Sequence, residues 1–302
     1  MDLNTHESRH VRIFRSRLAR FLLRVMAPTV ATAVTYWMMG WPEFMTSLLV
    51  LAGLITVAAL TMWTKRRLLA RFLLSIVAPI AFLTGFFWMM GQPRYWLSAI
   101  VDYERADRAA PPESDVVVFT GSSSVRKWET LAADMKPINV VNRAFGGSQI
   151  DLVTYYARRI VIPYHPRAIV LYAGDNDLSF PPWKSPELVL EEFKQFVTLI
   201  HDELPEAWLY YISMKPAPWG DWRLMNRTNR LIAAYSQTQE RVQYIDVSGA
   251  MLDAKGELRR EFYDWDPMHM NASGYALWTS IIKPILIARL GSQQNSEQRQ
   301  ER

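Results

Sequence analysis

A serine, a histidine and an aspartate stand where they could form a nucleophile and its base. Ser123 follows the apolar run Val116–Phe119, and Asp266 lies three residues before His269, ahead of an apolar-periodic segment. A carboxylate at this spacing can hold one ring nitrogen and leave the other for a serine hydroxyl. Taken singly, Gly-Ser-Ser-Ser is more often a loop, and Asp-x-x-His is more often a capping aspartate beside a surface histidine. Both alternatives stay open at this point.

Two further segments supply hydrogen-bond donors of the kind that stabilise an oxyanion. Gly147 lies in a Gly-Gly-Ser sequence after one strand-like segment, and Asn176 lies in Gly-Asp-Asn-Asp after the next. Glycine permits close backbone approach, so the Gly147 N–H could point at a substrate carbonyl. The Asn176 amide could add a second donor.

These four patches, in the order Ser, Gly, Asn and Asp-x-x-His, resemble the SGNH hydrolases, also called GDSL esterases and lipases. The resemblance covers roughly residues 115–290. It implies that Ser123 is the nucleophile, that Asp266 and His269 complete a triad, and that Gly147 and Asn176 form the oxyanion hole with the Ser123 N–H. The implied reaction is cleavage of ester-linked acyl groups through an acyl-enzyme, with no metal and no organic cofactor.

The chain departs from the family pattern at two positions. Ser122 stands where the family has aspartate, and Asp175 replaces the second glycine of Gly-Gly-Asn-Asp. Neither position supplies a reacting atom. Asp175 and Asp177 offer too few oxygens for calcium, so we interpret both as turn-stabilising residues. With Asp266 beside it, His269 is expected to have a pKa near or above about 6.5.

Two other functions remain open. The acyl group could pass to an envelope glycan, which would make the protein an O-acyltransferase, or the domain could be a non-catalytic membrane interaction protein that keeps the fold. Small-molecule, lipid and glycan esters all fit as substrates. The sequence does not indicate an oligomeric state.

Charge is unevenly distributed along the chain. Residues 1–100 hold 11 Lys/Arg and 3 Asp/Glu, a balance of +8, whereas residues 101–302 hold 23 and 26, a balance of −3. The folded part therefore has no basic excess, which argues against nucleic acid as a partner. The absence of cysteine excludes disulfides, thiolate metal sites and a cysteine nucleophile.

The N-terminal third reads as a membrane anchor. A basic segment, residues 1–24, precedes three apolar runs within residues 25–92, at about 25–41, 44–63 and 72–90. Each run approaches the roughly 20 residues that cross a bilayer. Leu18–Leu23 recurs as Leu69–Leu74, 51 residues further on, so the first and third spans look like duplicates.

Basic residues predict the orientation of these spans. Lys65, Arg66, Arg67 and Arg71 follow the second run, whereas the connection after the first has no Lys or Arg. The positive-inside rule then puts the N-terminus in the cytoplasm. Three crossings place the catalytic domain outside it, so we predict an integral inner-membrane protein with a periplasmic or extracellular hydrolase domain.

Residues 115–290 alternate strand-like and helical segments. Strands are expected near 115–120, 138–142, 167–173, 207–213 and 242–247, and helices near 124–134, 149–160, 187–204, 224–238 and 271–289. This alternation predicts an α/β domain with a flavodoxin-like, doubly wound, five-stranded parallel sheet, preceded by three transmembrane helices. Residues 93–114 are expected to be a polar tether, so that residues 103–302 would fold alone. Residues 291–302 are expected to be a disordered tail.

Overall fold

The computed structural model describes residues 88–112, 115–180, 183–217, 220–266 and 268–300, together with residues 82, 85 and 86. The chain divides into two compact units, Met1–Phe86 and Phe87–Arg302, and nearly all the described residues belong to the second. The basic segment 1–24 and most of the predicted spans in residues 25–92 lie outside the described residues. Among the helices that are described, none is both long enough and apolar enough to cross a bilayer.

In the described part of the chain, a five-stranded sheet with the order β2-β1-β3-β4-β5 forms the centre of the second unit. Every adjacent pair is parallel. The strands are β1 (Val117–Gly121), β2 (Val140–Asn142), β3 (Ala168–Tyr172), β4 (Trp208–Ile212) and β5 (Val242–Ile245). All residues of β1 and β3 are buried, as their continuous apolar runs require. The predicted doubly wound sheet is confirmed.

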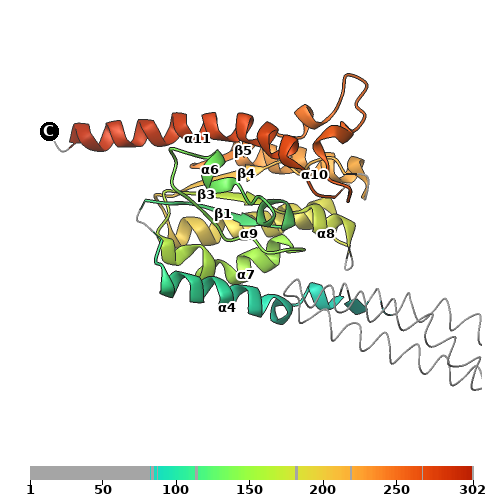
Figure 1. Ribbon diagram of the computed structural model, residues 1–302, viewed down its shortest axis with the longest axis horizontal. Helices are drawn as coiled ribbons and strands as arrows, with labels where there is room; N and C mark the ends of the chain where they lie inside the picture. The colour runs from blue at the N-terminus through green and yellow to red at the C-terminus, as the bar shows by residue number, and fades with distance from the viewer. Residues whose placement is uncertain are drawn as a thin grey trace, which may run out of the picture. The chain divides into compact units, whose positions relative to one another are not determined.

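Helices cover both faces of this sheet. They are α5 (Ser123–Arg126), α6 (Leu131–Asp134), α7 (Ile150–Ile160), α8 (Asp175–Ser179), α9 (Pro186–Glu203), α10 (Trp222–Ser236) and α11 (Ala272–Gln300), with short 3-10 turns at Ile162–Tyr164, Gly249–Met251 and Arg260–Phe262. Successive residues of β1 face opposite sides, so Val118 belongs to the core under α7 and α9 and Val117 to the core under α11. Figure 1 shows α7 and α9 on one side of the sheet and α11 on the other.

The predicted tether is wrong over most of its length, because residues 93–109 form a helix, α4 (Pro93–Ala109). Trp96 and Ile100 on one face of α4 are buried in the same core as α7. Figure 1 shows α4 running beneath α7. The polar composition of the segment belongs to its outer face, and the helix ends just before Pro111, as a Pro-Pro pair dictates.

Two further boundaries differ from expectation. The predicted helix 124–134 is broken into α5 and α6, since the chain turns between them and buries Trp128. The predicted disordered tail, residues 291–302, continues α11 as far as Gln300. Its Gln, Glu and Arg residues are good helix formers, so the backbone ladder extends at little cost.

The strand order places a topological switch point between β1 and β3. The chain leaves β1 toward β2 on one side, and β3 and its successors lie on the other. Open α/β sheets bind their ligands beyond the carboxyl ends of the strands at such a point. The segments after β1, β2 and β3 therefore converge there, and they contain Ser123, Gly147 and Asn176.

Candidate active site

Ser123 emerges from the sheet through a turn that only glycine can make. Gly121 has φ of +120°, and a Cβ atom there would lie 1.9 Å from the Tyr172 carbonyl oxygen. The close approach lets the Ser122 N–H donate to that carbonyl at 2.8 Å. The chain then enters α5 at Ser123, so the serine stands at the carboxyl edge of β1 beside β3.

His269 and Asp266 meet Ser123 from the loop before α11. The Ser123 hydroxyl lies 2.9 Å from His269 Nε2, and His269 Nδ1 lies 2.7 Å from Asp266 Oδ2. The backbone N–H of His269 also donates to Asp266 Oδ1 at 2.9 Å. Because an ionised carboxylate only accepts, it selects the tautomer with the proton on Nδ1. Nε2 is then free to accept the serine proton.

The turn that carries the histidine is fixed by its own backbone bonds. Tyr263 and Met270 pair as an antiparallel bridge, and the Asp264 N–H donates to the His269 carbonyl at 2.9 Å. The Asn271 side chain donates to the Tyr263 carbonyl at 3.0 Å. The loop is thus closed on itself before the long helix begins, which holds the backbone at His269, and the bond from Nδ1 to Asp266 orients the imidazole.

Gly147 and Asn176 lie on two segments that are hydrogen-bonded to each other. The loop that contains Gly147 (residues 143–148, here the Gly147 loop) is joined to β1 where the Phe145 N–H donates to the Gly121 carbonyl at 2.9 Å. Asn176 Nδ2 donates to the Ser148 carbonyl at 2.9 Å and keeps one further hydrogen. Within the described residues, no protein acceptor meets the N–H of Ser123 or of Gly147. In this part of the chain, three N–H donors on these segments therefore have no protein acceptor.

A lysine that sequence reasoning missed lies against the histidine. Lys127 Nζ is 3.0 Å from His269 Nδ1 and 3.3 Å from Asp266 Oδ2. With the proton on Nδ1, the ammonium can donate only to the carboxylate, and its charge opposes an imidazolium. The spacing held a signal for this contact, since Lys127 follows Ser123 by four residues, about one helical turn.

A second missed lysine is buried next to the site. Lys215 follows β4, and its Nζ lies 3.3 Å from the Tyr172 hydroxyl and 3.8 Å from Asp175 Oδ2. Burial lowers the pKa of Lys215, and the charges of Asp175 and Asp266 oppose that shift. Its position at the carboxyl end of a strand was the available sequence signal.

These surroundings lower the pKa of both His269 and Asp266. Burial lowers the pKa of His269 below its ordinary value of 6.5, and the charges of Lys127 and Lys215 act in the same direction against the Asp266 hydrogen bond. The expectation of a pKa at or above about 6.5 is therefore wrong, because it counted the carboxylate alone. Burial also acts to raise the pKa of Asp266, but its bonds to His269 and the charge of Lys127 outweigh burial and lower it.

The two departures from the family pattern contact each other. The Ser122 hydroxyl lies 3.5 Å from Asp175 Oδ1, and Asp175 Oδ2 accepts from the Tyr172 hydroxyl at 2.9 Å. Asp175 thus connects the turn after β1 with the end of β3 and with Lys215. Its role exceeds the local turn hydrogen bonding that the sequence suggested.

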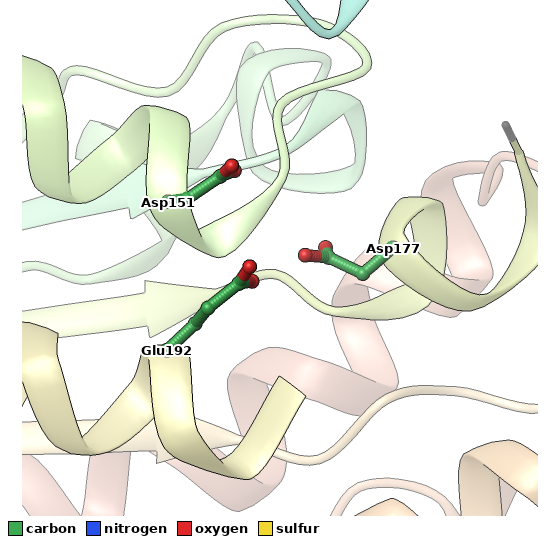
Figure 2. Close-up of side chains that lie close together, drawn as sticks. All are labelled: Asp151, Asp177 and Glu192. Atoms are coloured by element: carbon green, nitrogen blue, oxygen red, sulfur yellow. The ribbon is translucent and has the colours of Figure 1, made fainter. Parts of the chain in front are cut away.

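Asp177, which is buried, belongs to an ionic cluster whose member Asp151 is exposed. Figure 2 shows the carboxylates of Asp151, Asp177 and Glu192 pointing toward one another from α7, α8 and α9. Such oxygens could ligate a metal, but Lys184 Nζ already lies 3.1, 2.9 and 2.7 Å from them, respectively. The ammonium therefore occupies the place of a cation.

Burial dominates the protonation of two acidic residues of this cluster, Glu192 and Asp177. It raises the pKa of Glu192 to about 8 and raises that of Asp177, despite the opposing charge of Lys184. For Lys184, the surrounding carboxylates outweigh burial and raise its pKa. Asp177 Oδ1 also accepts from the Ile150 N–H at 3.2 Å. The cluster therefore links α8, which carries Asn176, to the start of α7 just beyond the Gly147 loop.

Comparison with solved structures identifies the fold. A GDSL-like lipase from Bacteroides thetaiotaomicron superposes with a TM-score of 0.54 at 18% sequence identity, covering 63% of this chain and 98% of that one. A candidate acylhydrolase from Bacteroides fragilis gives a TM-score of 0.55 at 20% identity, covering 61% of this chain and 94% of the other. At these identities the likeness concerns the fold, which is that of the SGNH hydrolases.

Among curated proteins, no sequence matches this chain. The profile of the GDSL-like Lipase/Acylhydrolase family does match it, over residues 105–277. That span holds the serine, both donor segments and the Asp-x-x-His loop, and it is more than half of the sequence. The chain therefore belongs to the GDSL-like lipase/acylhydrolase family.

Proposed function

We propose that this protein cleaves ester-linked acyl groups through a Ser123 acyl-enzyme. The observation that carries the proposal is the continuous hydrogen-bonded series from Ser123 Oγ to His269 Nε2, at 2.9 Å, and from Nδ1 to Asp266 Oδ2, at 2.7 Å. Family membership supports an ester hydrolase, and this geometry supports the serine as its nucleophile.

The first half-reaction follows from the tautomer. His269 Nε2 takes the Ser123 proton as Oγ forms a bond to the ester carbonyl carbon, and Asp266 stabilises the resulting imidazolium. The N–H groups of Ser123 and Gly147 and the remaining N–H of Asn176 donate to the oxyanion, each contributing about 3–4 kcal/mol. The tetrahedral intermediate collapses when the bond to the alcohol oxygen breaks, and the imidazolium gives that oxygen its proton.

Water completes the turnover. Neutral His269 takes a proton from a water molecule as its oxygen attacks the acyl carbon, and the same donors hold the second oxyanion. The bond to Ser123 Oγ then breaks, the imidazolium returns the proton to Oγ, and a carboxylic acid leaves. The low pKa of His269 favours the neutral base at the start of both halves.

Substitution of the three consecutive serines tests the nucleophile. Ser123→Ala should abolish hydrolysis of a small activated ester and labelling by a fluorophosphonate probe. Ser122→Ala and Ser124→Ala are matched controls, because they change the same turn without removing the proposed Oγ, and they should retain a substantial share of both. Equal activity in all three variants, or no labelling of the wild type, would defeat the proposal.

We further propose that the domain acts outside the cytoplasm, anchored in the inner membrane. Three apolar runs and the basic residues between Lys65 and Arg71 support this topology. A reporter that is active only outside the cytoplasm should work when fused after residue 302 and fail when fused after Thr64. The opposite pattern would exclude envelope lipids and glycans as substrates.

A further inference from the structure

Helix α4 contacts the Gly147 loop directly. A Cβ atom at Gly147 would lie 2.6 Å from Met90 Cε and 3.2 Å from Trp96 Cζ2, and the three nearest atoms all belong to these two side chains. The Trp96 indole N–H donates to the Met90 carbonyl at 2.7 Å, which fixes the pair. The Trp96 ring centre also lies 5.6 Å from that of Phe145 in the same loop. The N-terminal end of α4 therefore forms one wall against which Gly147 rests.

On the other side of the same loop, the Arg126 guanidinium packs against Gly146, where a Cβ atom would lie 3.1 Å from Arg126 Nε. Gly147 has φ of +69° and follows another glycine, so the backbone here has unusual freedom. Bonds exist on either side, from the Phe145 N–H to Gly121 and from Asn176 to the Ser148 carbonyl. Between those bonds, the direction of the Gly147 N–H depends on packing.

Helix α4 is itself firmly attached to the hydrolase unit. The Tyr156 hydroxyl donates to the Pro93 carbonyl and the Tyr103 hydroxyl to the Ala144 carbonyl, both at 2.5 Å. Arg159 pairs with Glu104 at 2.6 Å, and Arg143, at the start of the Gly147 loop, pairs with Asp107. The helix thus contacts the loop at both ends and cannot move without disturbing it.

We propose that α4 is a positioning element of the oxyanion hole, in which Trp96, together with Met90, holds the Gly147 N–H in its donating orientation. This inference rests on the proposed function of Gly147. It extends the catalytic unit toward the N-terminus, past residue 105, where the family match begins. Trp96 touches no reacting atom, so its effect should appear in turnover and in the order of the loop.

Substitutions in the full-length chain test this role. Trp96→Ala should lower kcat on a small activated ester about 10- to 100-fold, part of the loss seen when one oxyanion donor is removed, with KM changed less than about threefold. Trp96→Phe keeps an aromatic wall and should recover most of the turnover. Ile100→Ala is the matched control, since Ile100 is fully buried on the same helix. It should lower the melting temperature and leave kcat within about twofold.

Hydrogen exchange gives a readout that does not depend on activity. The Phe145 amide, bonded to Gly121, should exchange at least several-fold faster in Trp96→Ala and at the wild-type rate in Ile100→Ala. If Trp96→Ala does not fold, Met90→Ala replaces it in both measurements, because the Met90 side chain packs against Gly147 as well. Unchanged exchange at Phe145, or equal losses of kcat in the Trp96 and Ile100 variants, would overturn the inference. An inert wild type would instead refute the proposed hydrolysis, and exchange would still decide the role of α4.

Discussion

Replacing Lys127 by glutamine should move the acid limb of the pH profile upward. In the wild type, kcat/KM should rise with pH as His269 loses its proton, at a pKa below 6.5. The Lys127 ammonium lies 3.0 Å from His269 Nδ1 and disfavours the imidazolium. Lys127→Gln removes that charge, so the pKa of His269 should rise and the limb should follow it.

The size of the shift can be worked from the geometry. Two unit charges about 3 Å apart interact by about 1.4 kcal/mol in water and about 5.5 kcal/mol at an effective dielectric constant of about 20. The lower figure applies, because the Lys127 side chain is 38% exposed and the imidazolium charge is spread over the ring. About 1.4 kcal/mol is about one pKa unit. At a pH below the pKa of His269 in both proteins, kcat/KM of Lys127→Gln should therefore be about tenfold lower than that of the wild type. On the alkaline plateau the two values of kcat/KM should be equal.

Steady-state kinetics between about pH 5 and pH 9 at constant ionic strength would measure this. Lys194→Gln is the matched control, since the Lys194 side chain is 39% exposed and pairs with Glu191 on α9. At about 1 M salt the Debye length falls to about 3 Å, so the difference between Lys127→Gln and the wild type should shrink. An acid limb that stays in place, or moves to lower pH, would refute the electrostatic reasoning.

Three further changes have definite expected outcomes. Asp266→Asn should lower kcat by about a thousandfold or more with little change in KM, because the carboxylate acts mainly when the imidazolium forms; rapid ester kinetics would measure it. Lys184→Met leaves three clustered carboxylates without their cation and should lower the free energy of unfolding by about 3–5 kcal/mol in urea titrations. Since burial raises the pKa of Glu192 to about 8, the folded state holds that proton more tightly, so stability should fall as pH rises from about 5 to 8. Glu192→Gln should flatten this decline.

Each of these outcomes has a counterpart that would contradict it. Near-wild-type turnover in Asp266→Asn would mean that the dyad is not the base. Lys194→Met, which removes an exposed ion pair, should lower the free energy of unfolding by about 1 kcal/mol or less. If Lys184→Met lowers it by no more than that, the cluster is effectively solvated. Stability that rises from pH 5 to 8 would mean that Glu192 is ionised in the folded protein.

The sheet and the candidate triad could be predicted because both depend on local pattern and on one topological rule. Short, continuous apolar runs rich in β-branched and aromatic residues, such as Val116–Phe119, are typical of strands buried on both faces. In a parallel sheet the carboxyl ends of such strands meet, so residues that follow them converge although they are far apart in sequence. That rule brings Ser123, Gly147 and Asn176 together, and the loop before α11 brings His269 to them.

Helix α4 could not be predicted by the same reasoning. The second half of its segment is rich in Asp, Glu and Arg, and such a segment between a predicted membrane anchor and a domain resembles a linker. Whether its charges are solvated or paired depends on Arg143 and Arg159, which the chain brings to Asp107 and Glu104 only after folding. The second compact unit begins at Phe87. A fragment starting at residue 103 would lack Trp96 and Ile100, which are buried in the core with α7, so its independent folding stays a prediction that expression of the fragment would test.

The lysines show why a motif alone underdetermines a site. The order Ser, Gly, Asn and Asp-x-x-His indicates which residues react, but it does not specify the burial and the charges around them. Here burial lowers the pKa of His269, and the charges of Lys127 and Lys215 add to that shift. Hydrogen bonds from His269 and the charge of Lys127 lower the pKa of Asp266. An isolated Ser-His-Asp series would lose its base as the pH fell toward about 6.5. With its lower pKa, His269 should stay neutral, and so able to act as a base, to lower pH.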